Sequence, residues 1–513
     1  MIAYISRRLG TLALILFGSS FLLYNLAAIS GDPIGDLRTS TQPNAKALIQ
    51  QLTTRLNLDV PPPLRYFMWL KGVLSSFVGR ADFGNTREGR PVLEALASAV
   101  PTTIRLVTAA TFIAIILGIT IGIVTALRQY SRFDYAMTFV SFLLFSLPIF
   151  WVAVLLKQFM AIEFNNFLVS PKITPLWLAI IGLLTGVIWA AIIGGNRKRV
   201  WLVFLIAGGG SALLVQTLQL LNWFLQPGLG PIVIFGLGIG VAFGITHLSV
   251  GLQNRAALKT SLLMAVFALA FYYPTQAVFN SKLHALGIVL LALLTIGISI
   301  AGSFIFSRID RGPIIRTSVI TSMIIGLLTI LDKLMQTWKP YFESDAINGR
   351  PVPTIGQANS LLETGNYWLT TLDTVMHLIL PTIALTAISF AGYIRYSRGT
   401  LLEVLNQDYI RTARAKGLTE RTVIMRHAFR NTLIPLTTII VVEIASIIGG
   451  AIITERVFGW QGMGTLFNQA INTVDLNLLM GVFVITSTLA VLANLVADLI
   501  YSALDPRIRV VKQ

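Results

Sequence analysis

The charged side chains most able to bind a partner are concentrated between positions 408 and 435, where Arg and Lys recur every few residues. The rest of the chain is mostly apolar, since 55% of its residues are hydrophobic and only 12% are charged. Guanidinium and ammonium groups bind anionic lipid headgroups and acidic protein surfaces. We therefore expect this basic segment (residues 408–435) to contact either a membrane surface or a protein partner.

Local signals predict two short helices within the basic segment. Gly417 interrupts a helix-forming run, and Thr419 has the side chain of a helix N-cap. Pro435 stands where the next membrane span begins. The second helix is expected to place apolar residues on one face and basic residues elsewhere, namely Val423, Ile424, Ala428 and Phe429 against Arg421, Arg426 and Arg430. On these grounds alone, a helix resting on anionic lipid and a docking surface for a cytoplasmic partner are equally good interpretations.

Other patterns typical of enzymes are missing from the sequence. There is no G-x-x-x-x-G-K-[ST] phosphate loop and no G-x-S-x-G nucleophile motif. The four histidines are scattered, so we expect no metal site, and no cofactor is expected in this chain. Gly236, Gly240 and Gly244 recur every fourth residue in an apolar run, which favours close helix packing in lipid over a dinucleotide site.

Composition indicates a polytopic membrane protein. The mean hydropathy is +0.76, and the charged fraction is about half of the usual 25%. The absence of cysteine excludes disulfides and thiolate metal sites. The net charge of +17 is better explained by basic residues retained in cytoplasmic loops than by nucleic-acid binding, because no aromatic residues interleave with a basic stripe outside the basic segment.

The fold class predicted is all-α, with about twelve membrane spans. They are expected at about 9–29, 103–127, 134–162, 176–194, 200–221, 231–250, 259–279, 285–306, 313–331, 371–394, 434–454 and 477–503. The first run follows Arg7 and Arg8 and could be a signal peptide, but its length favours an uncleaved helix. Residues 31–100 are interpreted as an extracytoplasmic subdomain with turn signals and moderate helical patterning.

Loop charges predict that both termini are cytoplasmic. With the N-terminus inside, Arg and Lys gather in the cytoplasmic loops, including 197–199 and the basic segment, whereas the short outside loop at 222–230 has none. Three polar residues within or near the last spans are candidates for the translocation path or for interhelical bonding. They are Glu443, Asn494 and Asp498.

The basic segment closely resembles the coupling loop of ABC-transporter permeases, in particular the B-type permease of dipeptide and oligopeptide importers. Residues 409–418 read YIRTARAKGL, and Arg426-His427-Ala428 and Leu433-Ile434-Pro435 follow. The general permease pattern is Glu-Ala-Ala, three residues, then Gly. Here Arg411-Thr412-Ala413 occupies the triplet, so only the second Ala and the Gly match the general pattern, while the whole run resembles the peptide subfamily.

Eight further motifs are similar to that family and follow in order along the chain. They are YISRRL at 4–9, DFG at 82–84, RPV at 90–92, PTT at 101–103, HLILP at 377–381, ERVFGWQGMG at 455–464, NLVADLIY at 494–501 and DPRIR at 505–509. The resemblance covers about 1–168 and 351–513. It implies six core spans divided into 1–30, 101–168 and 351–513, the last containing a coupling segment at 403–433. The block at 169–350, with about six spans, is then an insertion between the third and fourth core spans, of unknown role.

The resemblance implies a multi-pass permease in the cytoplasmic membrane of a prokaryote. The implied partners are a second, homologous permease, two cytoplasmic ATPases that hold ATP and Mg, an extracytoplasmic binding protein, peptide substrate and membrane lipid. The residues implied to couple to the ATPase are Arg411, Thr412, Ala413, Arg414, Ala415, Lys416, Gly417, Leu418, Val423, Ile424, Arg426, His427 and Phe429. The alternatives are a permease for another small solute, such as nickel or glutathione, and a proton-coupled secondary transporter.

Overall fold

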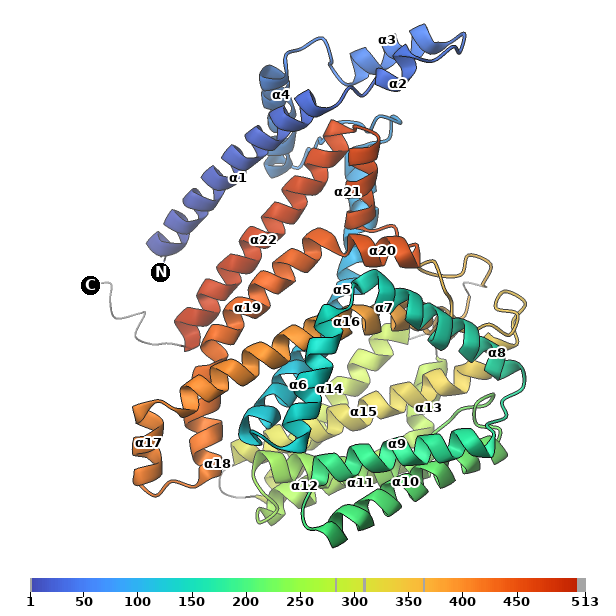
Figure 1. Ribbon diagram of the computed structural model, residues 1–513, viewed down its shortest axis with the longest axis vertical. Helices are drawn as coiled ribbons and strands as arrows, with labels where there is room; N and C mark the ends of the chain where they lie inside the picture. The colour runs from blue at the N-terminus through green and yellow to red at the C-terminus, as the bar shows by residue number, and fades with distance from the viewer. Residues whose placement is uncertain (1, 282–283, 308–310, 363–364, 505–513) are drawn as a thin grey trace. The chain divides into compact units, whose positions relative to one another are not determined.

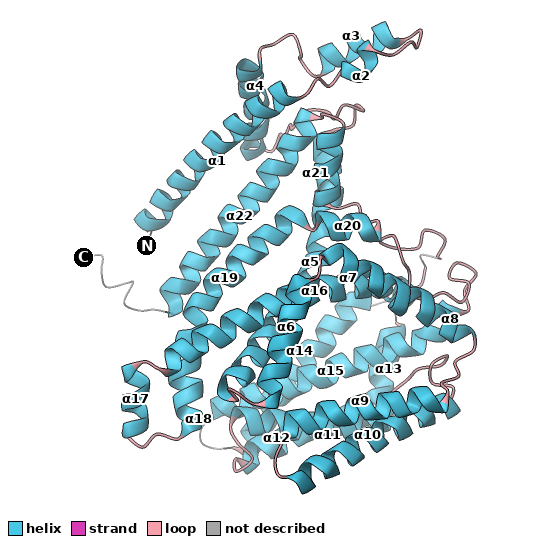
Figure 2. Ribbon diagram, in the orientation of Figure 1, coloured by secondary structure: helices cyan, strands magenta, loops and turns pink. Residues whose placement is uncertain are grey.

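The computed structural model describes residues 2–281, 284–307, 311–362 and 365–504 (Figure 1). Within these ranges some helical side chains, including those of 444–450 and 497–504, also lie outside the description. The described residues form helices and their connections, without a β-strand (Figure 2). The predicted all-α fold is therefore confirmed.

The chain divides into two compact units. The first unit comprises Met1–Ala161, Thr354–Gln357 and His377–Gln513, and the second comprises Ile162–Pro353 and Ala358–Met376. Residues 169–350 all fall in the second unit. That these residues are an insertion stays a prediction.

The helices of the first unit begin with α1 (Ile2–Ser30), α2 (Gly35–Arg38), α3 (Ala45–Arg55) and α4 (Pro62–Leu74), followed by α5 (Val92–Leu127), α6 (Arg132–Ser146) and α7 (Ile149–Leu156). After α16 (Tyr367–Leu405), which has residues in both units, come α17 (Asp408–Ala415), α18 (Glu420–Thr422), a π-helix (Val423–Ala428), α19 (Phe429–Gly450), α20 (Ile452–Phe458), α21 (Met463–Asn472) and α22 (Leu476–Leu504). In Figure 1, α19 and α22 run side by side.

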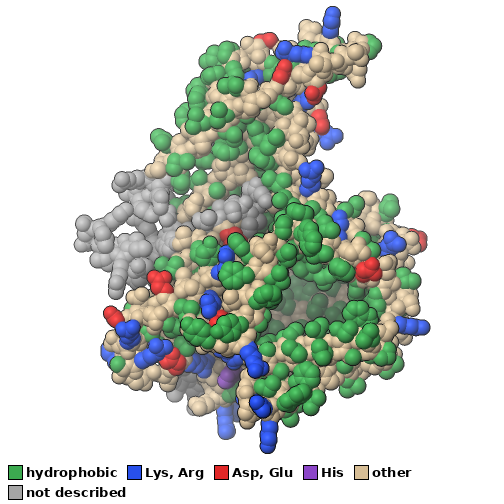
Figure 3. Space-filling view, viewed as in Figure 1, with side chains coloured by type: hydrophobic (Ala, Val, Ile, Leu, Met, Phe, Trp, Pro, Cys, Tyr) green, Lys and Arg blue, Asp and Glu red, His purple; other side chains and the backbone are tan. Residues whose placement is uncertain are grey.

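The second unit contains α8 (Glu163–Val169), α9 (Pro175–Ile193), α10 (Arg197–Leu220), α11 (Gly230–Ser249), α12 (Arg255–Ala270), α13 (Tyr272–Asn280), α14 (His284–Phe306) and α15 (Arg311–Phe342). Apolar side chains cover much of the face over α9 and α10, as expected for helices in contact with lipid (Figure 3).

Ten helices in the described part of the chain are long and apolar enough to cross a membrane, or eleven if the bent pair α12–α13 counts as one span. The sequence predicts about twelve. The remaining predicted span, 434–454, corresponds to α19, part of whose side chains lie outside the description. The predicted span at 134–162 is divided, because Pro148 lacks an N–H and holds Leu147 extended, so that the apolar span runs from Ile149 to Val169.

The extracytoplasmic segment predicted at 31–100 packs on α1 through aromatic residues. Tyr66 of α4 is fully buried, and its hydroxyl lies 2.8 Å from that of Ser20 on α1. The rings of Tyr24 and Trp69 contact Tyr66 with centroids 5.5 and 5.9 Å away. These contacts fix α4 against α1.

The glycine stripe of α11 does not pack as predicted. Gly236, Gly240 and Gly244 are exposed, and a β-carbon placed on any of them would meet no atom within 4 Å. The buried face of α11 is instead offset by two residues and includes Gly238, which approaches Ala265 and Ile325. The close packing therefore uses Gly238, and the predicted face was wrong within this chain.

The core of the second unit is organised around a buried carboxylate. Asp332 of α15 accepts hydrogen bonds from the backbone N–H groups of Leu229 and Gly230, at 2.7 and 3.0 Å, where α11 begins. It also accepts bonds from the Tyr272 hydroxyl at 2.5 Å and the Gln336 amide at 2.8 Å. Tyr272 lies at the 58° bend between α12 and α13, so the Asp332 side chain joins α15 to the start of α11 and to this bend.

Asp332→Ala is expected to destabilise the protein. The substitution leaves two partly buried N–H groups and the buried Tyr272 hydroxyl without their acceptor, and a buried group left unsatisfied costs about 1–3 kcal/mol. The measurement is the thermal unfolding midpoint of the purified protein in detergent. Asp345→Ala is the matched control because Asp345 is exposed. Equal midpoints for the two variants would contradict the structural role of Asp332.

Candidate functional site

The basic segment forms a helix, a tight bend and a second helical stretch between α16 and α19. The first helix, α17, ends at Ala415, and Gly417 follows with φ of +75°. The Gly417 N–H donates to the Arg414 carbonyl at 2.9 Å. A left-handed residue after a helix is the usual place for glycine, because it has no β-carbon. The predicted Gly bend is confirmed.

Thr419 begins the second helical stretch. Its hydroxyl accepts from the Thr422 N–H at 3.4 Å, as predicted for an N-cap. After the single turn α18, residues Val423–Ala428 form a π-helix before α19 continues. In a π-helix, positions five apart lie above one another. Val423 and Ala428 therefore share one face, and both are fully buried.

A small apolar cluster holds the two helices of the basic segment together. Its buried members come from the end of α16, from α17 and from the π-helix, and they pack against Ala126 near the end of α5. They are Leu401, Ile410, Ala413, Val423 and Ala428. Ala413 and Val423, both implied contact residues, therefore face the interior of this chain. They support the basic segment, and their side chains are not available to a partner.

The exposed surface of the basic segment is both basic and apolar. Arg411, Lys416 and Arg426 are exposed, and Thr412 and Ala415 are exposed beside them on α17. Ile424, His427 and Phe429 are half-buried. Large apolar side chains lie among the basic groups: Tyr409 is 43% exposed, Leu418 40% and Met425 56%. Met425 was not among the residues expected to couple, and it lies two residues after the buried Val423, on the opposite side of the helical stretch.

Arg414 and Glu420 form an ion pair across the bend. The guanidinium donates to both carboxylate oxygens, at 2.7 and 3.2 Å. These hydrogen bonds lower the pKa of Glu420 and raise that of Arg414, so the pair is ionised at neutral pH. Because the pKa of Glu420 is lower in the folded protein than in the unfolded chain, the pair stabilises the fold at any pH above the unfolded pKa. This stabilisation is lost as the pH falls through the pKa of Glu420 in the folded protein. Because both side chains are largely exposed, the contribution is at most about 1 kcal/mol.

The helix that leads into the basic segment is fixed to α5 and α6. Arg398 of α16 donates to both oxygens of Asp134 at 3.0 Å, and Asp134 is 2% exposed. Ser397 donates to the Gly118 carbonyl of α5, and no side chain would fit at Gly122, where Ser397 passes. The end of α16 is thus held by a bidentate ion pair and by close backbone approach.

The three candidate polar residues have different surroundings. Glu443 is half-buried on α19 and lies near the hydroxyl groups of Ser389 and Tyr393 on α16, which is consistent with bonding between helices. Asn494 is exposed on α22. The side chain of Asp498 lies outside the described residues. The structure therefore places Glu443 beside polar side chains of α16. It assigns no role in transport to Glu443, Asn494 or Asp498.

Two motifs that lie far apart in the sequence meet in the first unit. Glu455 of α20 is fully buried and accepts from the Thr103 hydroxyl of α5 at 2.7 Å and from the Thr465 N–H at 2.9 Å. Thr103 in turn accepts from the Met463 N–H at 2.8 Å. A β-carbon at Gly462 would overlap both the Glu455 and the Thr103 side chains. The residues of ERVFGWQGMG and PTT thus form one compact, hydrogen-bonded structure.

Comparisons with known proteins agree with these features. The model of the family described as the inner-membrane component of binding-protein-dependent transport systems matches residues 214–510. This match covers more than half of the chain. The chain belongs to that family.

Several named relatives are permeases of peptide transport systems. The chain is 38% identical over 189 residues to the oligopeptide transport system permease protein OppB of Mycobacterium tuberculosis, covering 37% of this chain and 56% of the relative. It is 43% identical over 147 residues to the dipeptide transport system permease protein DppB of Escherichia coli, covering 29% and 42%. The chain thus spans about half the length of these relatives.

A third relative matches differently. The dipeptide transport system permease protein DppB of Alkalihalophilus pseudofirmus is 25% identical over 511 residues, covering 99% of this chain and 100% of the relative. Residues 169–350 therefore have a counterpart in at least one relative.

Gly417→Pro is expected to open the bend of the basic segment. Proline fixes φ near about −65° and has no N–H, whereas Gly417 has φ of +75° and donates to Arg414. The measurement is limited trypsin digestion of the purified protein, with faster cleavage after Arg414 and Arg421 expected. Gly417→Asn is the matched control, because asparagine tolerates left-handed backbone. Unchanged digestion of Gly417→Pro would show that the bend does not need this residue.

Proposed function

We propose that this chain is the transmembrane permease subunit of an ATP-driven importer of dipeptides or oligopeptides. The family and the names of its relatives support this assignment, as do the sequence motifs of the basic segment. The chain would form half of a translocation path and contain no ATPase of its own. It would lie in the cytoplasmic membrane of a prokaryote with both termini and the basic segment in the cytoplasm.

The proposed assembly has four kinds of partner. A second, homologous permease completes the path, and two cytoplasmic ATPases bind ATP and Mg. An extracytoplasmic binding protein delivers the peptide, and lipid surrounds the spans. The class of transport system named by the family description includes a binding protein, which supports that partner directly.

The observation that carries the proposal is the exposed surface of the basic segment. Tyr409, Leu418 and Met425 present apolar area among Arg and Lys side chains, and the buried cluster beneath them holds the surface in one shape. Apolar side chains surrounded by charge are typical of protein-binding surfaces.

The mechanism follows from the attachment of the basic segment to α16 and α19. Closure of the ATPases on ATP would displace the basic segment, and α16 and α19 would move with it because they are continuous with it. The arrangement couples the two events only if the ATPase contacts the segment differently in its two states. The internal residues Val423 and Ala413 would transmit the displacement, and the exposed residues would receive it.

Other cargoes are distinguished by one measurement. The complete transporter is purified with its binding protein, and the ligand retained by that protein is identified. A nickel ion or glutathione in place of peptide would change the substrate while leaving the permease assignment intact. Uptake by this chain alone, abolished by a protonophore without loss of ATP, would instead favour a proton-coupled secondary transporter.

Charge reversal at Arg414 is expected to uncouple ATP hydrolysis from uptake. Arg414→Glu places two carboxylates across the bend and repels its halves, so peptide uptake per ATP hydrolysed should fall about tenfold. The double variant Arg414→Glu with Glu420→Arg restores the ion pair and should recover most of the uptake. Uptake and ATPase activity are measured together in proteoliposomes. Failure of the double variant to recover would mean that Arg414 contacts the ATPase itself.

Met425→Asp is expected to weaken binding of the ATPase subunits. The substitution adds a charge to the most exposed apolar side chain of the basic segment and does not touch the buried cluster. The measurement is the ratio of ATPase to permease after affinity purification, with a several-fold decrease expected. Met425→Leu keeps the apolar surface and should copurify normally. An unchanged ratio for Met425→Asp would exclude this surface as the docking site.

A further inference from the structure

A cavity of about 890 Å3 lies in the first unit, walled by α2, α3, the start of α5, α21 and the 84–91 turn. Sites for small ligands typically have volumes of about 300–1,000 Å3. At this end of the molecule, acidic and basic side chains are interspersed over α2 and α3 (Figure 3). The basic segment and the cavity use different parts of the chain, and no sequence motif pointed to the cavity.

The turn that forms one wall is rigid. The Thr86 N–H donates to the Arg90 carbonyl at 2.8 Å, and the Arg90 N–H donates to the Thr86 hydroxyl at 3.1 Å. Gly89 has φ of +94°, and a β-carbon there would meet the Arg55 guanidinium. Glycine at this position therefore lets Arg55 lie against the turn, where its Nη1 donates to the Arg87 carbonyl at 3.4 Å.

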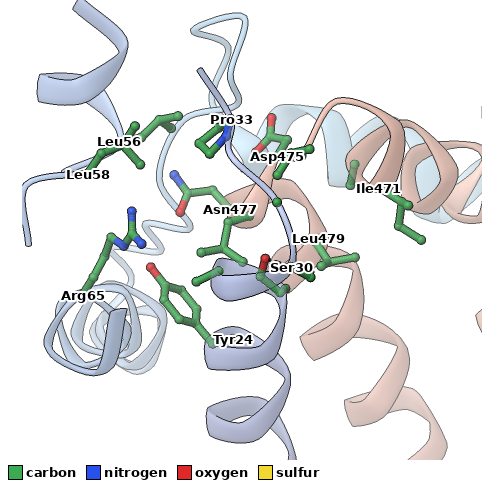
Figure 4. Close-up of a pocket in the computed structure, with 16 residues that line it drawn as sticks. Tyr24, Ser30, Pro33, Leu56, Leu58, Arg65, Ile471, Asp475, Asn477 and Leu479 are labelled. Atoms are coloured by element: carbon green, nitrogen blue, oxygen red, sulfur yellow. Dashed lines mark hydrogen bonds between the residues drawn. The ribbon is translucent and has the colours of Figure 1, made fainter. Parts of the chain in front are cut away.

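The turn is also fixed to the start of α22. The Arg87 N–H donates to Asp475 at 2.6 Å, and its guanidinium donates to the Thr473 carbonyl at 3.2 Å. Asp475 is 3% exposed and accepts a second bond from the Leu478 N–H. A smaller cavity of about 220 Å3 shares Asp475 with the larger one, and Figure 4 shows Tyr24, Arg65 and Asn477 around it. Arg87 and Asp475 thus have structural partners.

The remaining charged groups of the cavity are not neutralised in this way. Glu88, Arg90 and Glu94 are exposed, and none forms an ion pair within the part of the chain that the structure describes. Charges of both signs therefore line one open cavity without an ion-pair partner among the described residues. A ligand with one positive and one negative group would satisfy them.

The rest of the lining adds amide and apolar groups. Gln461 and Gln469 can donate to and accept from a peptide bond, because a primary amide does both. Leu37, Leu52 and Leu466 provide apolar surface for side chains. An inorganic ion would not use this apolar surface, and a lipid chain would leave the charged groups unpaired.

We propose that this cavity binds a short peptide through its two free termini. Arg90 holds the terminal carboxylate together with Arg55, which lines the same cavity, because the guanidinium fork is well matched to a carboxylate. Glu94 and Glu88 hold the terminal ammonium, and the glutamines bind the peptide bond between them. This inference rests on the proposed function, in which the cavity receives peptide on the extracytoplasmic side before it enters the path.

The test measures binding of trileucine to the purified transporter complex in nanodiscs, without the binding protein. Free trileucine is compared with its C-terminal amide and its N-acetyl form. The wild type is expected to bind the free peptide about tenfold more tightly than either modified form, because each modification removes one charge-assisted contact. Arg90→Ala should abolish the preference over the amide, and Glu94→Gln should abolish the preference over the N-acetyl form.

Lys46→Ala is the matched control, because Lys46 is exposed on α3 and does not line the cavity. It should keep both preferences. Equal binding of the three peptides by the wild type, or equal weakening of all three by Arg90→Ala, would overturn the proposal. Arg90→Ala could instead keep both preferences for the free peptide but no longer copurify with the binding protein. That result would also overturn the proposal and would identify the cavity as the surface on which the binding protein docks.

A separate measurement distinguishes failure of the proposed function. ATP-dependent uptake of trileucine is measured with the complete wild-type transporter in vesicles. Absence of uptake of this and other short peptides would contradict the peptide importer itself. Normal uptake together with lost terminus preference in the wild type would contradict only the cavity proposal.

Discussion

The burial of Val423 and Ala428 is the contact on which the rest of the basic segment depends. These side chains lie five residues apart, and the π-helix brings them onto one face against Ile410 and Ala413. Without this contact, α17 and the second helical stretch would be two short helices, and helices of such length are not stable alone. The Gly417 bend and the Arg414–Glu420 pair shape the connection, but the apolar cluster supplies the burial that orders it.

The same cluster joins the basic segment to the membrane helices. Leu401 and Ala126 are members from α16 and α5, so a displacement of the segment reaches both helices directly. Arg398 and the buried Asp134 add a bidentate pair, and moving Arg398 away would leave this ion pair broken at a buried carboxylate. The elements are therefore expected to move together, because separating them would expose apolar surface and leave a buried carboxylate unpaired.

Local features could be predicted from the sequence, and features that need distant residues could not. The bend at Gly417 and the cap at Thr419 depend on neighbouring residues, and both are confirmed. An α-helical period of 3.6 residues already places Met425 about 200° from Val423, so its exposure was within reach of the sequence. The packing face of α11 was assigned to Gly236, Gly240 and Gly244 although Gly238 makes the contact. Periodicity identifies small residues on one side of a helix, but it does not show which side a neighbouring helix covers. The cavity brings together residues from Leu37 to Leu478, a combination that no local pattern reveals.

One helix connects the two sites of the first unit. The beginning of α5 contributes Glu94 and Ser98 to the cavity, and its end contributes Ala126 to the cluster beneath the basic segment. Its 36 residues extend over about 54 Å at the usual rise per residue. Hydrogen bonds from Thr103 to Glu455 near one end, and close approach to α16 near the other, leave α5 little freedom to move alone. A ligand that shifts the start of α5 would therefore act on the basic segment through the helix itself. This requires the ligand to bind more tightly when α5 is in one of its two positions than when it is in the other.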